Sequence, residues 1–199
     1  GTTGGITAQH EFRDLVREIV IGLGFQEVLT FALSNPDKLY TRMSIAPRNP
    51  VEVKNPRVQT LTCLRDWLIP SLMEILSANV HVTYPQRIFE VGDCVIRRGS
   101  QVDEPVRLAS LSCHATSSFS EARSSIDALL SAIGLECTLV EADHASFLQG
   151  RVATVLIGSE PIGIVGEIHP QVLENWGIQN PAVAFELEVE PLRIASSNR

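Results

Sequence analysis

The chain has 199 residues, of which 44% are hydrophobic and 20% are charged. These are the proportions of an ordinary folded protein, and they exclude wholesale disorder. The formal net charge of -7 argues against this surface as the main electrostatic grip on a nucleic acid. No run of about 18 apolar residues is present to span a bilayer, and no leader sequence follows Gly1. We therefore expect a cytoplasmic protein or a domain of one.

The first predicted element is an amphipathic helix between Thr7 and Gly24. Its apolar residues recur at steps of three and one, which places them on one face of a helix. Thr7 fits the N-cap position, and the glycines after residue 21 end the helix. This stripe can cover the chain's own core or meet a partner's helix. It consists of Phe12, Leu15, Val16, Ile19, Val20 and Leu23.

The next segments predict shorter elements. Leu29, Phe31 and Leu33 alternate with smaller or polar residues, as in a strand. A short helix is expected to start at Pro36, and a longer one to cover residues 70–79.

The second half of the chain is rich in strands. Strand patterns occur at 86–98 and 106–115, and an amphipathic helix ends at Gly134. Four strand-like runs follow, and the middle two form a hairpin across residues 158–161. Because strands cluster instead of alternating with helices, we predict an α+β fold with a mainly antiparallel sheet. We expect one domain over residues 1–195 and a disordered tail at 196–199.

The cysteines and histidines do not predict a metal site. The four cysteines are separated by 31, 19 and 24 residues, and no histidine lies at zinc-finger spacing from them. We expect the thiols to be small buried side chains, although their spacing alone leaves a metal site or a disulfide open. They are Cys63, Cys94, Cys113 and Cys137.

No catalytic constellation stands out either. The chain contains neither a G-x-x-x-x-G-K-[ST] phosphate loop nor a G-x-S-x-G nucleophile elbow. Arg65, Arg97 and Arg98 could each contact phosphate, but an ordinary exposed arginine is the simpler interpretation. The glutamates at positions 186, 188 and 190 share one face of a predicted strand, which we expect to be solvated.

Two long segments resemble the β subunit of phenylalanyl-tRNA synthetase. The first joins the Asn55-Pro56 turn, Leu64-Arg65, a helix reading L-x-P-x-L-x-x-x-L-x-x-N over residues 68–79, and the strand I-F-E-V-G at 88–92. The second reads G-R at residue 150, then I-G-x-x-G-E-I-H-P-x-V-L and F-E-L near the end. With the opening helix, the resemblance covers residues 4–193. It implies the catalytic-like, inactive C-terminal module of that subunit, in its archaeal or eukaryotic type.

The resemblance implies the fold of class II aminoacyl-tRNA synthetases, an antiparallel sheet flanked by helices. In that fold the first signature helix packs at a subunit interface, which would give the stripe from Phe12 to Leu23 its role. The second signature ends in an arginine that holds the ATP α-phosphate, followed two residues later by a glutamate. Arg97 matches the arginine, but Gly99 stands at the glutamate position. The glycine-rich segment and arginine of the third signature are not found.

These departures predict a non-catalytic domain with a vestigial nucleotide site at Arg97. The resemblance implies a catalytic α subunit as partner in an (αβ)2 assembly, which charges tRNA(Phe) with phenylalanine using ATP and Mg2+. This fragment itself is expected to hold no cofactor and no metal, to meet tRNA(Phe) only through the whole enzyme, and to contact no membrane. We expect the α-subunit interface to use the N-terminal helix stripe and the segment from Leu64 to Asn79, with Leu68 and Leu72.

Two alternatives remain at this stage. The chain could be a stand-alone synthetase paralogue that forms an acyl-adenylate, with Arg97 as its best phosphate contact. It could also be a regulatory module that binds a small molecule in a vestigial pocket.

Overall fold

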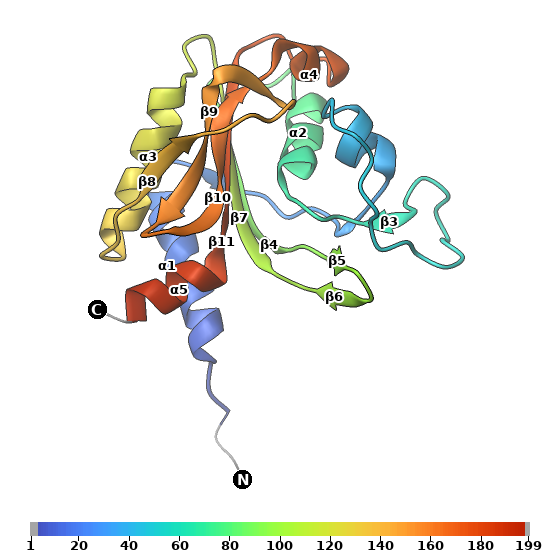
Figure 1. Cartoon of the computed structure of the whole chain (residues 1–199). Coiled ribbons are helices and arrows are strands. Elements are labelled where there is room, and N and C mark those ends of the chain that lie inside the picture. The colour runs from blue at the N-terminus through green and yellow to red at the C-terminus, as the bar shows by residue number, and fades with distance from the viewer. Residues whose placement is uncertain (1–3, 198–199) are drawn as a thin grey trace.

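A seven-stranded sheet with helices on both faces organises the chain (Figure 1). The structure is a computed structural model and describes residues 4–197. Its elements are α1 (Ala8–Gly22), β1 (Gln26–Glu27), β2 (Leu33–Ser34), the short helix η1 (Asp37–Thr41), β3 (Cys63–Leu64), α2 (Ile69–Ala78), β4 (Gln86–Asp93), β5 (Ile96–Arg98), β6 (Gln101–Asp103), β7 (Val106–Cys113), α3 (Phe119–Ala132), β8 (Thr138–Glu141), β9 (Phe147–Ile157), β10 (Glu160–Ile168), α4 (Pro170–Asn175), β11 (Ala182–Glu188) and α5 (Val189–Ser197).

The strand order in this sheet is β1-β4-β7-β11-β10-β9-β8. Neighbouring strands are antiparallel except for β1, which pairs with β4 in parallel. The last strand, β11, therefore lies in the middle of the sheet between β7 and β10. This arrangement confirms the predicted α+β class and its mainly antiparallel sheet.

One face of the sheet is covered by α1, α3 and α5, as Figure 1 shows. Phe12, Val16 and Val20 of α1 pack in this layer with apolar residues of α3 such as Leu129 and of the sheet such as Phe185. All of these side chains are buried. The apolar residues spaced by three and one in the sequence are therefore the ones through which this helix packs on its own sheet.

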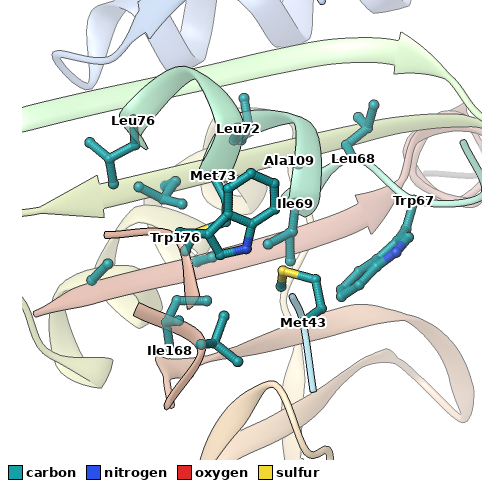
Figure 2. Packing of buried hydrophobic residues seen from close by; sticks show 14 of the residues in the cluster. Met43, Trp67, Leu68, Ile69, Leu72, Met73, Leu76, Ala109, Ile168 and Trp176 are labelled. Atoms are coloured by element: carbon teal, nitrogen blue, oxygen red, sulfur yellow. The ribbon is translucent and has the colours of Figure 1, made fainter. Parts of the chain in front are cut away.

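The opposite face is covered by α2, η1 and α4. Figure 2 shows side chains of α2, with Met43 after η1 and Trp176 after α4, packed against those of the sheet. They form one closed apolar cluster, in which the labelled residues are Met43, Trp67, Leu68, Ile69, Leu72, Met73, Leu76, Ala109, Ile168 and Trp176. Each face of the sheet thus carries a buried apolar cluster.

Several boundaries agree closely with the predictions. Thr7 caps α1, and its side-chain oxygen accepts the backbone N–H of His10 at 3.4 Å. The helix predicted over residues 70–79 is α2, displaced by a single residue. The predicted hairpin is β9 and β10, and Gly158 in its turn has a φ of +60°.

Two predictions about extended segments need correction. The strand predicted from Leu29 to Leu33 forms only at residues 33–34, as β2, because the chain before it is irregular and bends at Ala32. The strand predicted to run through Glu190 ends at residue 188, where α5 begins. Because buried Leu192 holds α5 against the core, residues 196–197 are helical and not a disordered tail. Residues 198–199 of the predicted tail lie outside the described residues.

Candidate functional site

The predicted interface residues fall into two groups. Five of them are buried in the chain's own two apolar layers, where they pack against other side chains of this chain. These five are Phe12, Val16, Val20, Leu68 and Leu72. Ile19 and Leu23 are partly buried against the α1 layer, and Leu15 is exposed. A helical apolar stripe identifies a buried face, but it does not say whose core buries it.

Among the described residues, the two most exposed large apolar side chains lie on the segment that follows β1. Leu29 is 81% exposed, Phe31 is 82% exposed, and Leu33 is 39% exposed. They lie within five residues of one another in the sequence, in the loop before β2 and at its first residue. We call these three side chains the apolar stripe. Exposed side chains of this size and kind, grouped on one segment, are typical of a surface that binds another protein.

A buried polar network fixes the orientation of the apolar stripe. Thr30, which lies between Leu29 and Phe31, donates its hydroxyl to Glu90 Oε2 at 2.6 Å. Arg65 binds Glu90 Oε1 at 2.9 Å through Nη2, and its backbone N–H donates to the carbonyl of Ala32 at 2.9 Å. Thr30 is thus held inward, while its two neighbours, Leu29 and Phe31, are exposed.

Arg65 therefore differs from both of its sequence-based interpretations. Its side chain is only 4% exposed and is paired with Glu90, so it is neither a surface residue nor a phosphate contact. The guanidinium also donates from Nε to the carbonyl of Asp93 at 3.0 Å. Through these contacts, Arg65 connects the segment before α2 to the strand β4 and to the segment after β1.

Arg97, the vestigial nucleotide-site candidate, lies on the exposed β5–β6 hairpin. Its backbone pairs with Val102, and the neighbouring Arg98 forms an ion pair with Asp103 at 2.7 Å. Gly99 turns the hairpin with a φ of +64°, a conformation that disfavours a glutamate there. The backbone at this position thus favours the glycine that replaces the second-signature glutamate.

A cavity of about 240 Å3 opens on the sheet face that also carries α2. Its wall combines cationic, anionic and aromatic side chains, namely Arg48, Trp67, Arg107, His144, Glu186 and Glu188, beside Gly163. Arg107 is bound by two carboxylates: Nη1 lies 2.9 Å from Glu186 and Nη2 lies 3.3 Å from Glu188. The cavity is thus polar, but its central cation is already paired.

Glu186 corrects the prediction of a solvated glutamate face. It is 4% exposed, whereas Glu188 and Glu190 are partly exposed, and Glu190 belongs to α5 and pairs with Arg193 at 2.6 Å. The prediction was wrong because both faces of β11 are covered, so alternation along this strand does not separate a wet face from a dry one.

The sequence and fold of the chain both match known aminoacyl-tRNA synthetase proteins. A family model described as "Phenylalanyl tRNA synthetase beta chain CLM domain" matches residues 1–189. The chain belongs to this family. This confirms the family indicated by the motifs from Asn55 to Gly92 and from Gly150 onward.

Curated relatives of the CLM domain are phenylalanine–tRNA ligase β subunits of archaea. The chain is 44% identical over 186 residues to that of Pyrococcus abyssi, covering 92% of this chain and 33% of the relative. It is 37% identical over 193 residues to that of Methanocaldococcus jannaschii, covering 96% of this chain and 35% of the relative. The chain therefore spans about a third of the length of the relatives it matches.

A solved structure shows the class II fold. Pyrrolysyl-tRNA synthetase from Desulfitobacterium hafniense superposes with a TM-score of 0.79 at 20% sequence identity. The match covers 96% of this chain and 70% of that one. It confirms the predicted class II synthetase-like fold of the CLM domain.

The thiols of the CLM domain have the character of small apolar side chains. Cys63, Cys94 and Cys113 are buried, and all four cysteines are free thiols. Burial raises the pKa of Cys63 and of Cys113 to about 11, which keeps these thiols neutral. Within residues 4–197, no three histidine, cysteine or carboxylate side chains gather as metal ligands. Over the same residues, no helix combines the length and the apolar character needed to cross a membrane.

One pH-dependent effect is expected in the CLM domain cavity. His144 packs against Trp67 and Phe147, and its burial, together with the charge of Arg48, lowers its pKa below the ordinary value of 6.5. Between these two pKa values the unfolded chain binds a proton that the folded chain does not, so the stability falls as the pH is lowered below 6.5. Urea unfolding at a series of pH values should show this loss. His144→Phe should make the profile flatter, and an unchanged profile would contradict the assignment.

Proposed function

We propose that this CLM domain is a non-catalytic part of a phenylalanine–tRNA ligase β subunit and binds the catalytic α subunit. In the proposed (αβ)2 assembly, the α subunit charges tRNA(Phe) with phenylalanine in the cytoplasm, using ATP and Mg2+. The domain itself holds no cofactor, and tRNA(Phe) meets it only as part of the whole enzyme. The names of the archaeal relatives and the class II fold support this assignment.

The apolar stripe is the observation that carries the proposed assembly role. Leu29 and Phe31 are each more than four-fifths exposed, although the buried network behind them holds their segment in place. Burying a large apolar side chain contributes about 1.5–3 kcal/mol. A segment whose neighbours already hold it by hydrogen bonds loses less conformational freedom when it binds. We therefore place the proposed interface on the segment after β1. The side chains of the α1 stripe, Leu68 and Leu72 were the ones expected from the sequence.

The charges on the sheet support the proposed lack of catalysis. Transition states of adenylate formation are stabilised by fixed cations around the phosphates. In the cavity, Glu186 and Glu188 pair with Arg107. Arg97 lies elsewhere, on the exposed β5–β6 hairpin, and Gly99 stands two residues after it. These groups offer no concentrated positive charge to a triphosphate.

Phe31→Asp tests the assembly role in the full β subunit co-expressed with its α subunit. We expect the variant to lose at least tenfold in α-subunit affinity, because the change removes an apolar contact and buries a charge at the interface. Co-purification and sedimentation velocity measure this loss. Val140→Asp is the matched control, because Val140 is a 47% exposed apolar residue on β8, at the other edge of the sheet.

A second variant in the same experiment separates assembly from catalysis. Arg97→Ala should bind the α subunit and support phenylalanine activation at the wild-type rate, since the proposed domain contributes no catalytic group. Normal α-subunit binding by a folded Phe31→Asp variant would refute the assembly surface. A large loss of activation by an assembled Arg97→Ala variant would refute the non-catalytic role.

A further inference from the structure

Glu186 makes an unusual set of contacts for a buried carboxylate on a central strand. Its Oε2 accepts the backbone N–H groups of Leu68 at 2.9 Å and Ile69 at 3.0 Å. Its Oε1 accepts Nη1 of Arg107 at 2.9 Å. One carboxylate from β11 therefore joins the first turn of α2 to a guanidinium on β7.

The contacts around Glu186 are those that a bound oxyanion would make. Helix α2 lacks a side-chain cap of its own, and Pro70 has no N–H to offer. The next N–H groups, of Ser71 and Leu72, bond to the carbonyl of Leu68. The free donors at this helix start are therefore the two that Glu186 binds. Backbone N–H groups at a helix start, together with an arginine, are a common protein arrangement for binding phosphate or carboxylate.

We propose that Glu186 is an internal anion that occupies a binding position for a phosphate or carboxylate group in the cavity wall. The side chain accepts the two N–H groups at the start of α2 and pairs with Arg107 in the cavity wall. The cavity exists, but its anion-binding position is filled by the chain itself.

The surroundings of Glu186 keep it in this position. Gly163 lies on the neighbouring strand β10, and a Cβ atom at this residue would lie 2.1 Å from the carbonyl oxygen of Glu186. The absence of that Cβ lets β10 approach β11 closely. The charged partner, Arg107, is in turn held by Glu188 at 3.3 Å. Glu186 is therefore fixed from the backbone and from its partner, and it is not a mobile surface acid.

This proposal rests on the proposed non-catalytic role of the domain. It offers one structural reason for that role, which is that the Glu186 carboxylate occupies the anion-binding position. A ligand with a phosphate or carboxylate group would have to displace a covalently attached carboxylate, which is present at a very high effective concentration. Binding of an anion in the cavity and binding of the α subunit at the apolar stripe are separate measurements. Failure of one is therefore distinguishable from failure of the other.

The test removes the internal anion and supplies a free one. The full β subunit in complex with its α subunit is prepared as wild type and as Glu186→Ala, and phosphate binding is measured by equilibrium dialysis with labelled inorganic phosphate. We expect the variant to bind one more phosphate per β subunit than the wild type. Formate should compete for this additional site, which would show that the position takes a carboxylate as well as a phosphate.

Glu188→Ala is the matched control. Glu188 also lines the cavity and contacts Arg107, but α2 donates its N–H groups to Glu186. This control should bind no additional phosphate. A folded Glu186→Ala variant without the extra equivalent, or an equal gain in Glu188→Ala, would overturn the proposal.

A second measurement covers the case in which Glu186→Ala loses its fold in dilute buffer. Free phosphate or formate should then restore the far-UV circular dichroism signal and raise the unfolding midpoint more than the same salts do for the wild type. An absence of this recovery would also overturn the proposal.

Discussion

The Glu90→Ala variant is expected to lose about 3–5 kcal/mol of unfolding free energy, because it leaves the Arg65 guanidinium buried without its counter-charge. Glu90 and Arg65 are 2% and 4% exposed at their side chains, and their nitrogen and oxygen atoms lie 2.9 Å apart. Thr30 would lose its acceptor at the same time. Urea or thermal unfolding measures the loss, and α-subunit binding should weaken with it because the network orients the apolar stripe.

Two controls show that the buried, unpaired charge causes the loss. Asp103→Ala removes one partner of the exposed pair with Arg98 and should cost less than about 1 kcal/mol. In the double variant Arg65→Met/Glu90→Leu, both charges are gone, and it should recover much of the stability lost by Glu90→Ala. Equal losses for Glu90→Ala and Asp103→Ala would contradict the role of burial.

The second large loss is expected for Gly163→Ala, which should lower the free energy of unfolding by about 3 kcal/mol or more. The new Cβ would lie 2.1 Å from the carbonyl oxygen of Glu186 and within 2.9 Å of two atoms of Leu187. Backbone atoms cannot rotate away, so β10 and β11 would have to separate in the centre of the sheet. Urea unfolding of the variant against the wild type measures the effect.

The matched control for this substitution is Gly22→Ala, at the end of α1. A Cβ atom at this residue would have no atom outside the neighbouring backbone within 4 Å, and alanine favours a helix more than glycine does. The control should therefore be neutral or slightly stabilising. A comparable loss in both variants would show that the crowding at β11 is not what makes Gly163 necessary.

The periodic parts of the fold could be predicted from the sequence. Helix α1 follows from the spacing of Phe12, Val16 and Val20 and from the cap at Thr7, since local hydrogen bonding and one buried face determine such a helix. The β9–β10 hairpin follows in the same way from two strand patterns joined at Gly158. The family followed from ordered motifs, which carry information that composition and periodicity lack.

The candidate site could be predicted only in part, because its geometry depends on pairing between distant segments. Glu186 and Arg65 are charged residues, and composition places such residues at the surface unless a partner is known. Their partners lie far away in the sequence: Leu68 is 118 residues from Glu186, and Glu90 is 25 residues from Arg65. The exposure of Phe31 could not be predicted either. An alternating pattern does not reveal which residues of a segment the rest of the chain covers.

The central position of β11 has a consequence for synthesis of the protein. Strands β1, β4 and β7 form one side of the sheet and β10, β9 and β8 the other, and β11 is the strand that pairs with both sides. The ribosome makes residues 182–188 after every other strand of this sheet. The two half-sheets can therefore form early in the nascent chain, but they join into one sheet only after residue 188 has left the exit tunnel. Until then, the edges of β7 and β10 that β11 will cover remain unpaired.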